Sequence, residues 1–195
     1  DMDASGAVRD YRRICNYETG EITVQWSDER GAWKRRSFVS RDADVAVFEL
    51  QASSAGKLNC AISLQMPAEM NFPKGLKTKC LHTKDYLNIR VNYAAPMDTI
   101  GYEGGIRVKQ KGGSSFLRND TLYIKDASEI LLLSRTQKYP ENCGAEWNKG
   151  LLKKGLDAIR ANYNGLLKAH KALHTSIYNR VRIDLGATPQ ERSLS

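Results

Sequence analysis

The sequence predicts a mainly β protein, an antiparallel β-sandwich that is followed by a long amphipathic α-helix. Two observations support this prediction. About eight short segments with apolar alternation or continuous apolar runs lie between turn residues, at intervals typical of an antiparallel sandwich. From Asp157 to Val181 the large residues instead recur in steps of three and four, which places them on one face of a helix.

The first half of the chain contains the clearest strand patterns. Alternation of apolar and polar residues begins near Tyr11. Ile22 to Trp26 and Trp33 to Val39 are predicted to form a hairpin, because turn-forming residues separate two alternating segments. Asp44 to Leu50 is almost continuously apolar, which is typical of a strand covered on both faces. Lys57 to Leu64 alternates again, so the sequence predicts two layers.

Further strands are predicted after an irregular segment. Pro67 to Thr83 is rich in lysine, proline and glycine without a clear period, and we expect a loop there. Tyr86 to Tyr93 alternates. Ile106 to Lys111 and Phe116 to Lys125 are predicted to be the arms of a second hairpin around two adjacent glycines. Ile130 to Ser134 is typical of a short buried strand.

The predicted helix needs a surface to cover its apolar face. Lys168 and Lys171 fall on the solvated side, so the large residues must pack on a sheet or contact something outside the chain. We expect residues 1–140 to form the β-sandwich, residues 141–182 a helical linker, and residues 183–195 the start of a connection to a further domain. The large residues are Ile159, Tyr163, Leu166, Leu167, His170, Leu173, Ile177, Tyr178 and Val181.

Composition and charge narrow the classes of function. With 195 residues and 41% hydrophobic residues, the chain can form one domain with a proper core. We recognise no leader peptide and no apolar span of membrane length, so we expect no membrane insertion. The net charge is +8, but the basic residues are scattered and lack a nucleic-acid-binding motif, so we expect no nucleic-acid partner. A salt-sensitive anion-binding module is the distant alternative.

The four cysteines match no zinc-binding pattern and no dense disulfide framework. Cys60 shares a predicted strand face with Leu58 and Ile62, which predicts a buried, small apolar residue. One disulfide among Cys15, Cys80 and Cys143 stays an open alternative.

Candidate catalytic residues are few. Acid/base hydrolysis needs two carboxylates at a defined separation, and Glu103, Asp120, Asp126 and Glu129 are candidates by residue type alone. Ser114-Ser115 has no histidine nearby in the sequence that could activate a nucleophile. We therefore assign no catalytic residue, and we expect this chain alone to be inactive.

The histidines and glycines point to neither a metal nor a cofactor. His170 and His174 are four residues apart on the predicted helix, but no third ligand accompanies them, so packing or hydrogen bonding is the favoured role. Gly104-Gly105 and Gly112-Gly113 lie between predicted strands and are interpreted as turn or bulge residues rather than as a phosphate-binding loop.

Aromatic residues are the candidates for sugar binding. Tyr102, Trp33 and Trp147 could stack on sugar rings, as could Trp26, although aromatic residues on half-buried strands usually belong to the core. From its chemistry alone, the chain is predicted to be a binding or structural module.

Several stretches occur in a recognisable order. Asp10 to Trp26 contains a tyrosine-arginine opening, an acidic-threonine-glycine turn and a strand, and Trp33 to Leu50 runs from an arginine cluster into an apolar strand. Ile100 to Ser114 and Asp126 to Tyr139 follow. The helix closes the series with Tyr163, Leu167, His170, Tyr178, Arg180-Val181 and Leu185-Gly186. Together these stretches resemble the amino-terminal domain of glycoside hydrolase family 95, the α-L-fucosidase family and its relatives.

The resemblance implies a non-catalytic β-sandwich that braces a helical barrel of the same parent protein. The barrel, expected beyond Ser195, would carry the catalytic carboxylates of an inverting hydrolase that cleaves terminal α-linked sugars from an oligosaccharide or glycan. Export to the periplasm or the extracellular space is also implied. A free-standing carbohydrate-binding or scaffolding β-sandwich module is the alternative. The helix residues expected at the interface with the barrel are Tyr163, Leu167, His170, Ile177, Tyr178 and Arg180.

Overall fold

The structure, a computed structural model, describes residues 6–53, 58–66, 74–181 and 186. The predicted connection over residues 183–195 lies outside the described residues, except for Gly186. Within these residues the chain forms eleven strands and then three helices. They are β1 (Arg9–Asn16), β2 (Glu21–Asp28), β3 (Gly31–Ser40), β4 (Val45–Ala52), β5 (Leu58–Ser63), β6 (Lys77–Cys80), β7 (Tyr86–Asn92), β8 (Gly101–Lys111), β9 (Ser114–Arg118), β10 (Thr121–Ala127), β11 (Glu129–Tyr139), α1 (Cys143–Lys149), α2 (Leu151–Ala158) and α3 (Tyr163–Tyr178).

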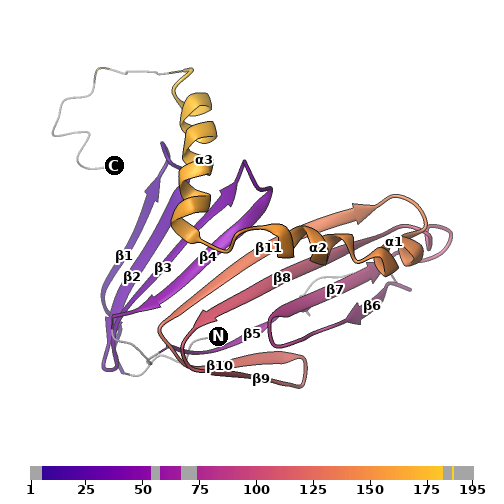
Figure 1. The fold of residues 1–195 in the computed structure, drawn as a ribbon, viewed down its shortest axis with the longest axis horizontal. Coiled ribbons are helices and arrows are strands. Elements are labelled where there is room, and N and C mark those ends of the chain that lie inside the picture. The colour runs from indigo at the N-terminus through magenta and orange to yellow at the C-terminus, as the bar shows by residue number, and fades with distance from the viewer. Residues whose placement is uncertain (1–5, 54–57, 67–73, 182–185, 187–195) are drawn as a thin grey trace.

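The strands form two antiparallel sheets (Figure 1). The large sheet has the order β1-β2-β3-β4-β11-β8-β7-β6, and the small sheet has the order β5-β10-β9. β11 lies inside the large sheet, where it pairs with β4 on one side and with β8 on the other. The small sheet packs on one face of the large sheet and the helices pack on the other. The predicted fold class, a mainly β sandwich-like arrangement with a helical part at its C-terminal end, is confirmed.

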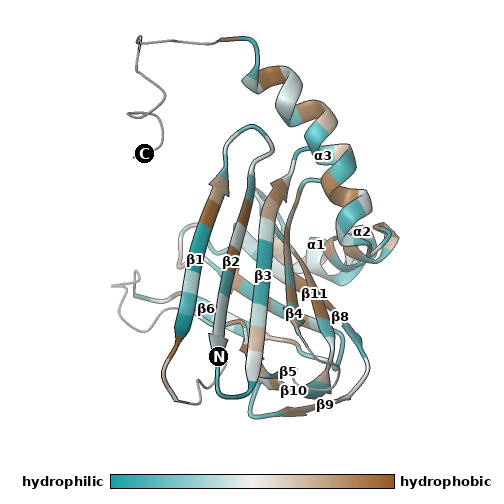
Figure 2. Cartoon of the chain, turned by 90° about the vertical axis from the view of Figure 1, so that its left-hand side faces the viewer, coloured by the Kyte–Doolittle hydropathy of each residue, from teal (hydrophilic) through white to brown (hydrophobic). Residues whose placement is uncertain are grey.

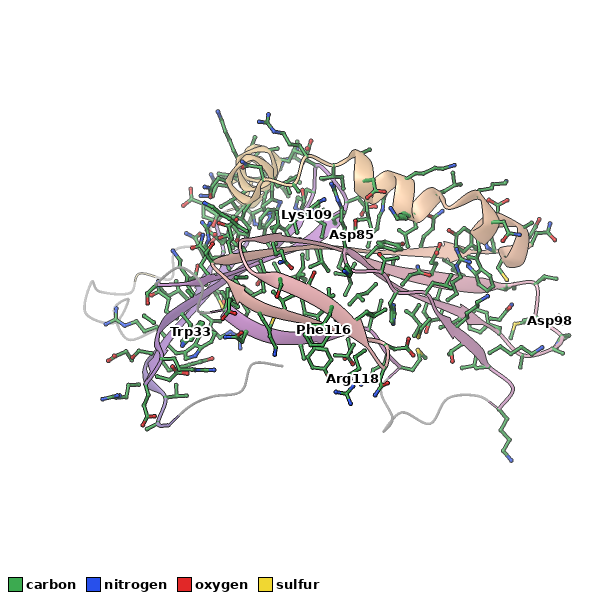
Figure 3. All side chains as sticks on the ribbon, turned by 60° about the horizontal axis from the view of Figure 1, so that its bottom comes forward. Trp33, Asp85, Asp98, Lys109, Phe116 and Arg118 are labelled. Carbon is green, nitrogen blue, oxygen red and sulfur yellow. The ribbon has the colours of Figure 1, made fainter. Side chains whose placement is uncertain are left out.

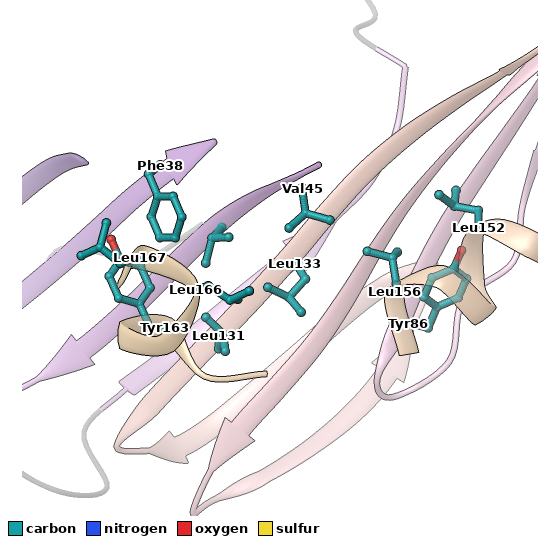
Figure 4. Close-up of a cluster of buried hydrophobic side chains, with 11 residues drawn as sticks. Phe38, Val45, Tyr86, Leu131, Leu133, Leu152, Leu156, Tyr163, Leu166 and Leu167 are labelled. Carbon is teal, nitrogen blue, oxygen red and sulfur yellow. The ribbon is translucent and has the colours of Figure 1, made fainter. Parts of the chain in front are cut away.

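Two apolar cores lie on opposite faces of the large sheet. In β11, Leu131 and Leu133 belong to the core beneath the helices, whereas Ile130 belongs to the core against the small sheet. β4 likewise buries Val45 under the helices and packs Leu50 on the other side. Burial of each large aliphatic side chain contributes roughly 1.5–3 kcal/mol. A strand covered on both faces has no solvated side, which explains the continuous apolar sequence of these two strands. Figure 4 shows the core beneath the helices.

The first predicted hairpin is confirmed, because β2 and β3 pair from Ile22 opposite Ser37 to Asp28 opposite Gly31. Trp26 lies opposite Trp33 in this register, and their rings stack with centroids 6.5 Å apart.

The second predicted hairpin is wrong. β8 pairs with β7 and β11 rather than with the segment that follows Gly112-Gly113. The segment predicted as one arm, Phe116 to Lys125, is divided between β9 and β10, which pair with each other across Asn119 and Asp120. Both residues have left-handed φ values, 48° and 56°. Two-residue hairpin turns need such values, which asparagine and aspartate tolerate, so this dipeptide was the true turn signal.

Two further segments differ from the prediction. Gly104 and Gly105 lie inside β8 and pair with β11, not in a turn. They provide space, because an ideal Cβ atom on Gly105 would lie 2.6 Å from the hydroxyl oxygen of Tyr86. Lys77–Cys80, within the predicted loop, forms the edge strand β6 beside β7. Residues 67–73 of that predicted loop lie outside the described residues.

All four cysteines are free, so the disulfide left open by the sequence is not formed. Cys60 and Ile62 lie on the predicted face beside the buried Leu58 and pack on the core between the sheets, although both are only partly buried. Burial raises the pKa of the Cys60 thiol to about 11. The thiol therefore stays protonated near neutral pH and behaves as a small apolar group.

The helix predicted from Asp157 to Val181 is interrupted, and α3 begins only at Tyr163. Arg107 on β8 stabilises the non-helical segment between α2 and α3. Its Nη1 donates to the carbonyl oxygen of Ile159 at 2.7 Å and to two carbonyl oxygens at the end of α2. The side chain of Asn162 then accepts a hydrogen bond from the backbone N–H of Gly165 at 2.7 Å, which is a typical N-cap. No helix in the described part of the chain combines the length and apolar character that crossing a membrane requires.

Replacing Arg107 with methionine is expected to destabilise the domain by about 2 kcal/mol, because the carbonyl groups at the helix break lose a charged donor while an apolar stem is kept. Urea unfolding measures this loss. Lys109→Met is the matched control, since Lys109 is exposed two residues further along the same face of β8 (Figure 3). It should change the free energy of unfolding by less than about 0.5 kcal/mol. Equal effects of the two substitutions would contradict the role given to Arg107.

Candidate functional site

The first half of α3 packs on the large sheet at β3 and β4. Tyr163, Leu166 and Leu167 are buried there, in the same core as Phe38 and Val45. The rings of Tyr163 and Phe38 meet edge to face, with centroids 5.2 Å apart. Because these helix residues recur in steps of three and four, α3 presents one continuous apolar face to the sheet (Figure 4).

A charged group fixes the beginning of α3. The guanidinium group of Arg36 lies 4.1 Å from the ring centroid of Tyr163, and its Nε donates to Glu49 Oε2 at 2.8 Å. The hydroxyl of Tyr163 donates to Glu21 Oε1 at 3.0 Å. Burial raises the pKa of Glu49, and the hydrogen bond and charge of Arg36 partly oppose that shift. Arg36 therefore compensates a buried carboxylate and contacts the helix at the same time.

Two histidines attach the middle of α3 to the turns at the ends of the strands. His170 Nδ1 accepts a hydrogen bond from the backbone N–H of Arg41 at 3.2 Å, and its Nε2 lies 3.0 Å from the carbonyl oxygen of Thr19. His174 Nδ1 accepts from Arg41 Nε at 3.1 Å, and its Nε2 lies 2.9 Å from the carbonyl oxygen of Tyr17. Because the two Arg41 groups that contact the rings, the backbone N–H and the Nε–H, can only donate, both neutral rings carry their proton on Nε2.

The two histidines therefore have the hydrogen-bonding role that the sequence favoured. In the described part of the chain, no group of three or more potential metal ligands is found. Burial, followed by the charges of His174 and Arg41, lowers the pKa of His170, while the hydrogen bond to Thr19 opposes the shift. Neutral His170 is thus the form that this environment stabilises.

The second half of α3 has exposed apolar residues. Leu173, Ile177 and Tyr178 are 45%, 46% and 48% exposed, and Val181, just after the helix, is 76% exposed. Leu173 and Ile177 continue the same helical face that begins at Tyr163. This part of α3 extends past the ends of β1 to β4, so the sheet does not reach it (Figures 1 and 2). A groove of about 670 Å³ lies beside it, with Phe38, Phe48 and His174 among its lining residues.

The six residues expected at a domain interface fall into a buried group and an exposed group, because the sheet covers only the first half of α3. Tyr163, Leu167 and His170 are buried against the domain's own sheet. Ile177 and Tyr178 are exposed, and so is Arg180 just beyond the helix.

The three aromatic candidates for sugar binding lie apart from one another. Trp33 is only 3% exposed, lies on the face of the large sheet opposite the helices, and donates its indole N–H to Asp28 at 3.1 Å (Figure 3). Trp147 is on α1, where its ring lies 5.7 Å from the guanidinium group of Arg90. Tyr102 on β8 belongs to neither core cluster and donates its hydroxyl to a methionine sulfur. The structure thus does not join these residues into one surface.

Glu103 and Glu129, two of the candidate carboxylates, do not form a catalytic pair. Glu103 is 2% exposed and accepts hydrogen bonds from Asn88, Arg90 and Tyr139 at 2.9, 3.0 and 2.9 Å. Burial, followed by the hydrogen bond and charge of Glu103, raises the pKa of Tyr139. Glu129 lies opposite Lys111, eight positions along β8 from Glu103, which corresponds to about 27 Å of strand. Inverting glycosidases need a separation of about 6.5–9.5 Å, so this pair cannot act together.

The other polar candidates belong to the small sheet. Asp120 lies in the β9–β10 turn, Asp126 lies near the end of β10, and Ser114 and Ser115 lie in β9. The structure brings none of them to Glu103, which lies on β8 beside the partners on β7 and β11.

Comparisons with known proteins agree with this fold. Residues 1–140 match the family model described as glycosyl hydrolase family 65, N-terminal domain. Among solved structures, a protein named as a kojibiose phosphorylase, from the human microbiome, superposes with a TM-score of 0.61 at 11% sequence identity, over 89% of this chain and 25% of that one. The chain therefore spans about a quarter of the length of that protein. A search of the curated proteins finds no match.

Proposed function

The chain belongs to the glycosyl hydrolase family 65 N-terminal domain family, and we propose that it is a non-catalytic domain that holds the catalytic domain of the same protein in place. The family match covers residues 1–140, which include the whole of the two sheets. Among the described residues, the buried candidate Glu103 is bonded to Arg90 and lies eight strand positions from the register partner of Glu129, which fits a domain whose role is structural.

The main support for this proposal is that the second half of α3 has exposed apolar residues. A helix face that buries Tyr163 and Leu167 against the sheet continues as Leu173 and Ile177, which are about half exposed. Exposed apolar residues aligned with a buried face are typical of a surface that contacts another domain. The remainder of the parent protein is the proposed occupant, because the solved relative is about three and a half times as long as this chain and α3 lies beyond the residues 1–140 that match the family model.

The proposed interface includes only three of the six residues that the sequence analysis expected there. Ile177, Tyr178 and Arg180 would contact the catalytic domain together with Leu173, whereas Tyr163, Leu167 and His170 hold α3 on its own sheet. A helical barrel as the catalytic domain is part of the proposal and rests on the resemblance to family 95.

For the substrate of the whole protein we propose a general class and, within it, a specific sugar. An oligosaccharide or glycan is supported by the family to which the chain belongs. A terminal α-L-fucoside, hydrolysed by an exported enzyme, is the finer proposal and is supported by the ordered stretches that resemble family 95. The solved relative is named as a kojibiose phosphorylase, so phosphorolysis is the reaction to test beside hydrolysis.

The test compares this chain with a longer one that continues through the natural downstream reading frame. Both are assayed with aryl α-L-fucoside, aryl α-L-galactoside, and kojibiose with inorganic phosphate. We expect activity only in the longer protein, because the reacting groups would belong to the catalytic domain. Turnover by the short chain would contradict the proposal. Binding of a fucosylated or galactosylated oligosaccharide by the isolated chain would instead support a free-standing carbohydrate-binding module.

A further inference from the structure

The contact between α3 and the strand-end turns depends on the protonation state of one buried imidazole. We propose that His170 is a pH-sensitive latch, which holds α3 on the β1–β2 and β3–β4 turns while the ring is neutral and releases the second half of the helix when the ring is protonated. This inference concerns the domain itself and needs no catalytic domain.

The hydrogen bonds of His170 leave no place for a second proton. Its Nδ1 accepts the backbone N–H of Arg41, and its Nε2 donates to the carbonyl oxygen of Thr19. A proton on Nδ1 would place two N–H groups face to face and remove the bond to Arg41. Because His170 is only 2% exposed, water cannot easily replace that bond.

The turn approaches the ring so closely that it needs a glycine. Gly20 has a left-handed φ of 64°, and an ideal Cβ atom on it would lie 2.9 Å from His170 Nε2. Thr175 adds a contact that does not titrate, because its hydroxyl donates to the carbonyl oxygen of Glu18 at 3.0 Å. The latch therefore joins three consecutive carbonyl groups of one turn, those of Tyr17, Glu18 and Thr19, to α3.

The surrounding charges oppose an imidazolium ion. The ring of His174 lies 5.0 Å from that of His170, and the cationic guanidinium group of Arg41, whose backbone N–H bonds His170, bonds His174. Among the described residues, no ion pair joins either histidine to a carboxylate. Asp44, which lines the same groove, pairs with Arg135 instead. The titratable or charged residues beside the two rings are Arg41 and Asp44 from the β3–β4 turn and Tyr178 from α3. Tyr17 and Glu18 from the β1–β2 turn contact α3 through their backbone carbonyl groups.

The direction of the pH effect follows from these contacts. Attachment lowers the pKa of His170 from its ordinary value of 6.5, so the attached helix binds fewer protons than the released helix. The latch is then fully effective above about pH 6.5 and weakens as the pH falls below that value toward the lowered pKa. For one proton, the equilibrium constant for attachment falls by up to tenfold per pH unit in that window.

Hydrogen exchange followed by NMR on the 195-residue chain tests the latch at pH 7 and pH 5, with each rate divided by the intrinsic rate at that pH. We expect the protection of the Arg41 amide and of the amides in the second half of α3 to fall, by up to about thirtyfold for one proton. The amides of β8 and β11 should keep their protection. Equal protection of α3 at the two pH values would overturn the proposal.

Two variants identify the group that titrates. His170→Gln cannot take up a proton near neutral pH, so its α3 should show the same protection at pH 7 and pH 5. His82→Gln is the matched control, because His82 also accepts a backbone N–H, that of Asn88, at 3.1 Å on β7. It should leave the response of α3 unchanged, and loss of the response in both variants would overturn the proposal.

If His170→Gln does not fold, a measurement on the unsubstituted chain tests the protonation state of His170 instead. The ¹⁵N chemical shifts of the imidazole report the tautomer directly. A neutral ring protonated on Nε2 at pH 7 supports the latch. A neutral ring protonated on Nδ1, or an imidazolium ion at pH 7, overturns it.

Discussion

Replacing Leu173 and Ile177 together by aspartate is expected to lower the activity of the longer protein about a hundredfold while the isolated domain stays folded. Both side chains are about half exposed in the domain, so the added charges are solvated there. In the longer protein they would be buried against the catalytic domain, and the loss of apolar burial alone costs about 1.5 kcal/mol for each residue. The measurement is kcat/KM on whichever sugar the unsubstituted longer protein converts.

The matched control for this prediction lies beside the apolar face of the same helix. Ala172 and Ser176 are exposed, and each is turned by about 100° around the helix axis from the adjacent Leu173 or Ile177. The double variant Ala172→Asp and Ser176→Asp adds the same charge to α3 and should keep the activity within about twofold, because surface substitutions are usually close to neutral. Thermal unfolding of the isolated domain must be similar for both double variants. If both lowered the activity equally, the contact would not involve the apolar face.

Replacing Glu103 by alanine is expected to destabilise the domain by about 3–5 kcal/mol, because one partner of a buried ion pair is removed. Arg90 would lose the carboxylate 3.0 Å from its Nε, and the buried hydroxyl of Tyr139 would lose its acceptor. Arg90 also donates to the backbone carbonyl of Trp147 at 2.9 Å, so the contact of α1 with the sheet should weaken as well. Urea unfolding followed by circular dichroism measures the change.

Glu146→Ala is the control for the buried pair. Glu146 forms an exposed ion pair with Lys149 on the same helix, and loss of such a pair costs only about 0.3–0.5 kcal/mol. A similar loss of stability for Glu103→Ala and Glu146→Ala would contradict the structural role of Glu103. Loss of enzymatic activity with unchanged stability would show instead that the carboxylate takes part in a reaction.

Local patterns predicted most of the sheet correctly. The hairpin of Trp26 and Trp33 follows from alternation on both sides of a turn, and the apolar run at Asp44 to Leu50 follows from burial on both faces. The second hairpin turn and the start of the long helix were predicted wrongly. The turn was assigned to the glycine pair after β8, although Asn119 and Asp120 form it. The helix start was assigned to Asp157 from periodicity, although Asn162 caps α3.

The edge strand β6 could not be found from its own residues. Lys77–Cys80 is short and largely exposed, so it shows no apolar alternation. Its extended conformation is supported by pairing with β7 from Lys77 opposite Asn92 to Cys80 opposite Ile89. Pairing between backbone groups does not depend on side-chain pattern, which is why such strands escape sequence analysis.

The candidate site was predicted only in part for the same reason. Periodicity identified an apolar helix face that includes His170, and the resemblance to glycoside hydrolases identified the class of domain. The partners of that face come from positions more than a hundred residues away, such as Thr19 and Arg41. No spacing in the sequence relates such distant residues.

By itself, the sequence determined which residues of α3 are apolar and that they share one face, because helical periodicity is a local property. Only the tertiary structure decided that Tyr163 and Leu167 are covered while Leu173 and Ile177 are exposed, since that depends on where β3 and β4 end. It also decided that Glu103 is a buried charge compensated by hydrogen bonds. The three partners of that carboxylate lie on β7 and β11, and only the packing of the sheet brings them together.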